Sequence, residues 1–303
     1  MRGLPDLGPE LGALLHGVAG TSPYLGRSIE REANWLAEAL DQAPETTMAT
    51  LCDGARLAEG PEIGTTLRRL KRRAALIIAL ADLGGLWPLE TVTGALTDFA
   101  EASAGAALVA ALRPSVEQGR LPGLTADDLD HGAGLFVLAM GKMGARELNY
   151  SSDIDLICLF DAKRFERDAL FRAREGYIRA VRRFTQTLSQ QTEEGYVFRT
   201  DLRLRPDAGS TPVAMSLQAA ELYYEAEGRT WERGAFIKAR ASLGDLDRGR
   251  GFLRALQPFI WRKHLDFATL HDVQDIRSRI RQHKALDRGA EAVAGHDVKL
   301  GRG

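Results

Sequence analysis

Apolar residues recur every three or four positions over the first part of the chain, a spacing that predicts amphipathic helices. The pattern is clearest over Ser28–Leu40 and over Thr65–Leu83. An alanine-rich stretch, Ala100–Leu112, ends this part of the chain. We therefore predict a helical subdomain over residues 1–112.

The helix expected over Thr65–Leu83 carries many basic residues beside its apolar stripe. The simplest interpretation is a solvated helix face, and the alternative is a docking surface. The stripe consists of Leu67, Leu70, Ala74, Ile77, Ile78 and Ala81, and the basic run consists of Arg68, Arg69, Lys71, Arg72 and Arg73.

The pattern changes after a stretch rich in proline and glycine, Arg113–Gly134, where we place a domain boundary. Two continuous apolar runs follow, Leu135–Met140 and Asp153–Phe160, and both are typical of buried strands. A glycine-bearing connection, Gly141–Asn149, joins them. The next segment, Asp168–Glu194, has the spacing of a long amphipathic helix.

Strict alternation of polar and apolar residues over Val197–Pro206 predicts a strand with one polar face. We expect it to be antiparallel to the strand at Asp153–Phe160. Its polar face would hold Arg199, Asp201, Arg203 and Arg205.

Helical patterns return in the last part of the chain. One helix is expected after the N-cap residue Ser216, and another from Thr230 that carries Lys238 and Arg240. We assign residues 113–248 to a core domain and residues 249–303 to the start of a C-terminal helical segment.

Composition narrows the class of protein. A net charge of −1 over 303 residues argues against a non-specific nucleic-acid binder. No run of about eighteen apolar residues is present, so no membrane span is expected. The two cysteines, Cys52 and Cys158, are far apart, and we expect free thiols in a reducing cytoplasm. Cys158 stands among apolar residues and is expected to be a small buried hydrophobe.

Several common catalytic patterns are absent from the sequence. The six histidines are scattered without zinc spacing, and no Ser-His-Asp or Cys-His arrangement stands out. Neither the Walker pattern nor G-x-G-x-x-G occurs. A P-loop and a dinucleotide-binding fold are therefore not favoured.

Two aspartates one residue apart, Asp153 and Asp155, are the most informative candidates. In a strand both carboxylates project from the same face. A solvated strand face is the commoner cause of such a pair. Here, however, a strand and a turn with Gly141 and Gly144 precede it, and such a turn lets backbone N–H groups approach a phosphate. This order of parts favours a site for Mg²⁺, with Mn²⁺ as the alternative, in phosphate chemistry.

A third acid, Asp201, is the best candidate to complete this site. Three carboxylates from two strands can hold two divalent ions about 3.5–4 Å apart. Taken alone, Asp201 would more simply form an ion pair with its arginine neighbours. Guanidinium groups also suit phosphate oxygens, which makes Arg203 and Arg205 candidates for substrate binding. Lys238, from the helix expected after Thr230, could add positive charge, as could Lys142 in the turn.

The chain resembles the glutamine synthetase adenylyltransferase family, also called glutamate–ammonia-ligase adenylyltransferase. The resemblance rests mainly on GKMGARELNYSSDIDLICLF, FRTDLRLRPDAGSTP, TWERGAFIKAR and the final HDVKLGRG. Near the N-terminus it also includes Ser22-Pro23-Tyr24-Leu25 and the helix RRLKRRAALIIALADLGGL.

The resemblance implies an α+β fold: a polymerase-β-like nucleotidyltransferase core with a mixed sheet, flanked by N- and C-terminal helical subdomains. The family has two such domains in tandem, and the order of motifs here is that of the first. In the family that half removes AMP from a tyrosine of glutamine synthetase by Mg²⁺-dependent phosphorolysis, in which phosphate attacks and ADP leaves. The second half adenylylates with ATP. The expected partners are glutamine synthetase and the PII signal protein, and the expected location is the cytoplasm.

The resemblance also assigns residues. Asp153, Asp155 and Asp201 match the family's metal-binding acids, and the Gly141–Gly144 turn matches its nucleotide-contacting loop. The full set that we assign to nucleotide and phosphate binding is Gly141, Lys142, Gly144, Ser152, Arg203, Arg205 and Lys238.

The sequence departs from the wider pattern in two places. Lys142 follows Gly141 where the superfamily prefers serine, and the chain stops at Gly303 where the family continues. The activity of the chain therefore stays open. One alternative is a non-catalytic docking or regulatory module that binds glutamine synthetase or PII. Another is a nucleotidyltransferase of other specificity, acting on RNA or an antibiotic; near-neutral charge argues against RNA.

Overall fold

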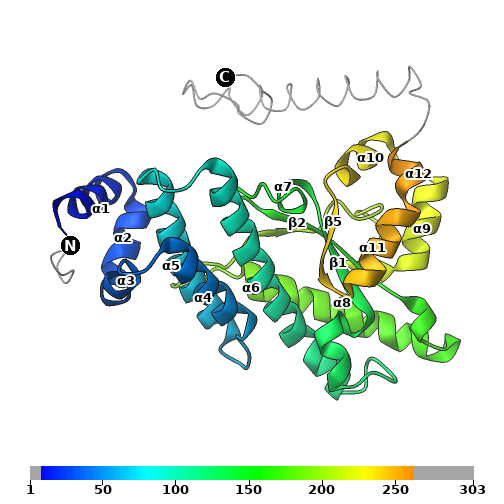
Figure 1. Ribbon diagram of the computed structural model, residues 1–303. Helices are drawn as coiled ribbons and strands as arrows, with labels where there is room; N and C mark the ends of the chain where they lie inside the picture. Colours follow the sequence, from blue (N-terminus) through cyan, green and yellow to red (C-terminus); the bar gives the residue numbers. More distant parts are fainter. Residues whose placement is uncertain (1–7, 262–303) are drawn as a thin grey trace.

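The computed structural model describes residues 8–261 of the chain. It is an α+β fold with a mixed sheet between two groups of helices, as expected (Figure 1). The amino-terminal helices lie on one side and the last described helices on the other. The end of the helix expected from position 249 and the HDVKLGRG segment lie outside the described residues.

The amino-terminal part is entirely helical. Proline opens three of its helices, where a missing N–H costs nothing. Ser22 caps the second by accepting a hydrogen bond from the backbone N–H of Leu25. The helices are α1 (Pro9–Thr21), α2 (Pro23–Arg31), α3 (Ala33–Ala39), α4 (Pro44–Arg56), α5 (Ile63–Leu83) and α6 (Leu89–Glu117).

The prediction of a single helix over Ser28–Leu40 is wrong, because the chain breaks at Glu32 between α2 and α3. The backbone of Glu32 leaves the helical region, with φ −106° and ψ 16°. Its carboxylate is buried and accepts from Arg72 and Arg73, each at 2.6 Å. An ion pair with α5 therefore fixes a break that local periodicity does not show.

The basic run of α5 is not a solvated face. Arg68 is 6% exposed and donates to the backbone oxygen of Gln190 at 3.0 Å. Arg72 is paired with both Glu32 and Glu194. Of the run, Arg69 alone is exposed. These side chains connect the helical part to the turn that precedes the third strand.

Replacing Glu32 by glutamine tests how much this pairing contributes. The new amide keeps one acceptor oxygen, and Arg72 keeps Glu194, but Arg73 loses its charged partner. We expect the free energy of unfolding to fall by about 2 kcal/mol, since hydrogen bonds to charged groups contribute about that much. Urea unfolding measures it. Glu30→Gln, on the exposed side of α2, is the control and should change the free energy by less than about 0.5 kcal/mol.

Helix α6 continues past its expected end at Leu112, through Pro114, to Glu117. Proline removes one hydrogen bond from the last turn. Beside this turn, Nη2 of Arg183 donates to the carbonyl oxygen of Ala111 at 2.7 Å. The domain division near position 112 stays a prediction. By length and composition α6 could cross a membrane, but most of it is buried against neighbouring helices, and core helices share these properties.

The sheet contains five strands in the described part of the chain. Strand β2 is antiparallel to β1, and β1 is antiparallel to β5. Strands β3 and β4 both pair with β2 in parallel, β3 near its start and β4 near its end. The strands are β1 (Leu135–Ala139), β2 (Ile154–Phe160), β3 (Thr200–Asp201), β4 (Ala214–Ser216) and β5 (Arg240–Gly244).

The strand expected over Val197–Pro206 is wrong in length and direction. Only Thr200 and Asp201 pair, and they pair in parallel with β2. The connection from β2 contains the long helix α8 (Arg167–Ser189), and a helical crossover returns the chain in the same direction. Antiparallel pairing would suit a short hairpin. Strands β4 and β5 are not indicated by the sequence pattern.

Two cores lie on opposite faces of the sheet. Alternate residues of β1, such as Val137, pack with α6 and α8, while Phe136 and Leu138 pack with the last described helices. Tyr224 and Phe252 fill the second core. Cys158 is buried in the first core as a free thiol, as expected.

The remaining elements are short connections and the second helical layer. They are η1 (Ala126–Gly134), α7 (Gly141–Gly144), η2 (Ala162–Arg164), α9 (Leu217–Ala226), α10 (Thr230–Phe236), α11 (Leu246–Ala255) and α12 (Gln257–Ile260). Ser216 caps α9 as expected, by accepting from the N–H of Ala219. Helix α10 ends at Phe236, so Lys238 follows it and Arg240 begins β5.

Candidate active site

The three aspartates lie around the start of β2. Asp155 and Asp201 are direct partners in the parallel β2–β3 pair. Asp153 comes just before β2 and has a half-exposed side chain, whereas the side chain of Asp201 is 17% exposed. The predicted third acid is therefore beside Asp155, although its strand runs in the other direction from the one expected.

Each of the two outer acids is paired with an arginine. Arg199 donates from Nε to Oδ1 of Asp153 at 2.5 Å. Arg203 donates from Nη2 to Oδ2 of Asp201 at 2.5 Å, and its backbone N–H also binds Asp201 at 2.8 Å. The charges of Asp155 and Asp153 also act on Arg203. One guanidinium group thus lies within the field of all three acids.

These contacts change the acidity of the paired groups. The hydrogen bond from Arg203 holds the pKa of Asp201 below its usual value, against the opposing effect of burial. The hydrogen bond to Asp153 raises the pKa of Arg199. The Asp201–Arg203 pair therefore contributes stability above the ordinary pKa of aspartate, and this contribution is lost as pH falls through the lowered value.

Replacing Arg203 by Gln tests this electrostatic coupling. We expect the titration midpoint of Asp201 to rise toward the ordinary aspartate value of about 3.9. Carbon-detected NMR of the carboxyl group measures it. Arg229→Gln gives the reference: it removes one positive charge from a residue outside this cluster and should leave the midpoint unchanged. An unchanged midpoint in both variants would contradict the pairing.

The two glycines of the turn have different roles. Gly141 has φ +53°, and a Cβ there would lie 3.0 Å from Oδ2 of Asp155. At Gly144 a Cβ would lie 2.0 Å from the backbone oxygen of Lys238 and 2.5 Å from that of Ala139. Gly141 therefore lets the turn approach the acids, while Gly144 lets it pack against the chain entering β5.

The turn is held in place from two sides. Arg240 donates to the backbone oxygens of Gly144 at 3.1 Å and Met143 at 3.0 Å. It also pairs with Glu101 of α6 at 2.5 Å. Further along, the hydroxyl of Tyr150 donates to Asp82 of α5 at 3.0 Å. The helical part thus positions the connection that leads to the acids.

The other predicted binding residues differ in their contacts. Lys142 is partly exposed in the turn, and the backbone N–H of Ser152 binds Asn149 at 3.1 Å. Lys238 pairs with Glu147 at 2.5 Å, from a loop rather than the expected helix. Arg205 donates to the backbone oxygens of Leu202, Ala208 and Thr211. It therefore orders its own loop, and its expected contact with phosphate is not favoured by this geometry.

Arg199 and Tyr196 also belong to the site, although neither is among the predicted site residues. Arg199 binds Asp153, the hydroxyl of Tyr196 at 2.6 Å and the backbone of Ser151. The available signal was its position two residues before Asp201 in the alternating segment.

The site fits a divalent cation in the kind of donor it offers. Asp155 and Asp201 are register partners, Asp153 comes two residues before Asp155, and hard oxygen donors of this kind suit Mg²⁺. The guanidinium group of Arg203 already lies in the field of all three carboxylates. Yet among residues 8–261 no group of three or more carboxylate, imidazole or thiolate side chains stands in metal-binding positions. Metal binding would therefore require the three carboxylates to come closer together, and the arginines to release Asp153 and Asp201.

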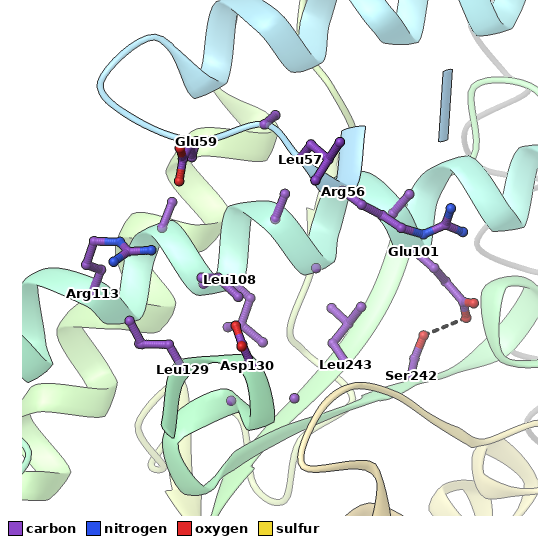
Figure 2. Close-up of a pocket in the computed structure, with 18 of the residues that line it drawn as sticks. Arg56, Leu57, Glu59, Glu101, Leu108, Arg113, Leu129, Asp130, Ser242 and Leu243 are labelled. Atoms are coloured by element: carbon purple, nitrogen blue, oxygen red, sulfur yellow. Dashed lines mark hydrogen bonds between the residues drawn. The ribbon is translucent and has the colours of Figure 1, made fainter. Parts of the chain in front are cut away.

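A large cleft lies elsewhere, between the α4–α5 connection, α6 and β5 (Figure 2). Its volume is about 870 Å³, and its lining is mixed, with Arg56, Arg113 and Asp130 beside apolar residues. Ser242 donates to Glu101 at 2.6 Å along one wall. Among the residues that the structure describes, the cleft is lined by none of those that we assigned to the site.

The mixed sheet, its helical layers and the three aspartates are consistent with a nucleotidyltransferase-like domain. The chain belongs to the glutamate-ammonia ligase adenylyltransferase family, whose model matches residues 12–255.

Relatives in three genera support this assignment. Proteins from Bradyrhizobium sp. (strain BTAi1), Rhodopseudomonas palustris (strain BisB5) and Xanthobacter autotrophicus (strain Py2) are 46%, 45% and 45% identical to the chain. Each is named bifunctional glutamine synthetase adenylyltransferase/adenylyl-removing enzyme. The matches cover 100% of this chain and 30%, 31% and 31% of the relatives. The chain thus spans about three tenths of the length of these relatives.

Proposed function

We propose that this chain is the adenylyl-removing half of a bifunctional glutamine synthetase adenylyltransferase, built on a polymerase-β-like core. The observation that carries the proposal is the register of β2 and β3, which brings Asp201 beside Asp155. Asp153 precedes Asp155 by two residues. The names of the relatives supply the substrate class.

In the proposed reaction an oxygen of inorganic phosphate attacks the phosphorus of AMP bound to a tyrosine. The new P–O bond gives ADP, the bond to the tyrosine oxygen breaks, and that oxygen takes a proton to restore tyrosine. Asp153, Asp155 and Asp201 would hold Mg²⁺, which as a bound Lewis acid supplies charge stabilisation. Arg203 would position phosphate oxygens once it leaves Asp201. No protein nucleophile is required.

Incubation of the chain with adenylylated glutamine synthetase, phosphate and Mg²⁺ tests the proposal. We expect ADP to form, and chelation of Mg²⁺ to stop its formation. Release of AMP without ADP would show hydrolysis, and ATP-dependent labelling of tyrosine would show the opposite half-reaction; either result would contradict the proposal. Relatives that perform both reactions are longer, so the same assay on the longer protein is the positive control.

The partners and location of the proposed function follow from the same assignment. Glutamine synthetase is the proposed substrate, the PII signal protein the proposed regulator, and the cytoplasm the proposed compartment. A non-catalytic docking module would bind glutamine synthetase with an affinity that does not depend on Mg²⁺. A titration of binding with and without Mg²⁺ separates the two functions.

A further inference from the structure

Two motifs that the proposed reaction does not use meet beside the third strand. Tyr24, from the Ser22–Leu25 motif, lies in the first turn of α2, and Lys71 belongs to the basic run of α5. The Nζ atom of Lys71 lies 5.9 Å from the ring centroid of Tyr24 and 5.0 Å from that of Tyr196. Lys71 is therefore held by two aromatic rings, one from each part of the molecule.

Lys71 is connected to the candidate acids through Tyr196 and Arg199. The guanidinium carbon of Arg199 lies 5.4 Å from the centroid of the same Tyr196 ring, and Arg199 also donates to the Tyr196 hydroxyl. Arg199 in turn binds Asp153 at 2.5 Å. A continuous series of contacts thus links α5 to the site.

The cations around Lys71 outnumber the acids that could neutralise them. Glu32 is paired with Arg72 and Arg73, and Glu194 with Arg31 and Arg72. Within the part of the chain that the structure describes, no carboxylate forms an ion pair or a hydrogen bond with Lys71. Burial, and secondly the charge of Arg199, lower the pKa of Lys71. Arg199 is neutralised by Asp153, whereas Lys71 is not, and a partly buried cation without an anionic partner is costly.

We infer that Lys71 and Arg199 form a subsite for a phosphate dianion, shared between the helical part and the core. This inference rests on the proposed function. The group bound would be inorganic phosphate before the transfer, and the terminal phosphoryl group of ADP after it, because phosphorolysis turns the first into the second. Lys71 is a point charge that can meet phosphate oxygens, while Arg199 would offer a planar set of donors once it leaves Asp153.

Binding of phosphate, ADP and AMP, measured by calorimetry without any protein substrate, tests the subsite. In Lys71→Gln we expect the affinity for phosphate and for ADP to fall roughly tenfold or more, the range for a lost charge-assisted hydrogen bond. AMP lacks the terminal phosphoryl group, so its affinity should change less than twofold. Lys71→Arg should recover most of the loss. Arg69→Gln, an exposed neighbour on the same helix, should bind all three ligands normally.

The outcomes separate this inference from the reaction itself. Lys71-dependent binding of phosphate in a chain that forms no ADP would support the subsite and reject only the proposed reaction. Loss of phosphate affinity without loss of ADP affinity would assign the subsite to the free ion alone. Unchanged affinities in Lys71→Gln, with a lowered unfolding midpoint, would overturn the inference and leave Lys71 a structural residue. A wild-type chain that binds neither phosphate nor ADP would overturn it as well.

Discussion

Replacing Asp155 by Asn is expected to lower the rate of ADP formation from adenylylated glutamine synthetase roughly a thousandfold. The reason is that Asp155 is the central acid of the site, with Asp201 beside it in register and Gly141 against its carboxylate. A bound metal contributes several kcal/mol to such reactions, and each 1.36 kcal/mol corresponds to a factor of ten in rate. Asparagine keeps the shape of the side chain but removes the charge that holds the cation.

The fold should survive this change, because asparagine has nearly the same volume. We expect circular dichroism and the urea midpoint to stay close to the wild type, while the affinity for Mn²⁺, followed by electron paramagnetic resonance, falls with the rate. The matched control is Asp168→Asn, because Asp168 is an exposed acid in the first turn of α8. This variant should keep the wild-type rate and the wild-type affinity for Mn²⁺. An Asp155→Asn chain with normal rate and normal metal dependence would refute the metal site.

Replacing Gly144 by Ala is expected to destabilise the protein by about 3 kcal/mol or more. The added Cβ would lie 2.0 Å from the backbone oxygen of Lys238 and 2.5 Å from that of Ala139. Both are backbone atoms, which cannot rotate away as a flexible side chain could. The turn or the start of β5 must therefore move, and overpacking of this kind is costly. Denaturant unfolding measures the loss.

Gly94→Ala provides the opposite control. Gly94 lies inside α6, and nothing comes within 4 Å of a Cβ added there. Alanine should therefore stabilise the helix by about 0.5–1 kcal/mol, since glycine is the poorer helix former. A small loss of unfolding free energy in Gly144→Ala would show that the turn tolerates a side chain. The glycine would then be better explained by the close approach of a phosphate to the backbone.

The helical part shows how far periodicity alone can predict. The apolar stripe of α5 is largely buried, as expected from Leu67 and Ile78, because local spacing determines which face of a helix is apolar. The same spacing could not show that Glu32 breaks α2 from α3, since that break depends on two arginines some forty positions away. Nor could it show that the basic run, except for Arg69, is at least partly buried.

The aspartates show the same limit at the site. Their residue types and the two-residue spacing of Asp153 and Asp155 indicated phosphate chemistry without any structure. The direction of β3 was predicted wrongly, because pairing depends on the crossover through α8 rather than on alternation within the strand. The attachment of Arg205 to its own loop, in place of a substrate contact, likewise depends on a turn that the sequence pattern did not reveal.

The sequence by itself determined the family, the apolar stripe of α5 and the buried strands β1 and β2, and it predicts the three acids. These follow from local spacing and from residue chemistry, both of which are present in the linear chain. Only the tertiary structure decided which cations face which acids, that Gly144 is a packing residue, and that Lys71 and Tyr24 meet Tyr196. Such contacts join positions far apart in the chain, and the free energy that selects them comes from burial and charge pairing in the folded state.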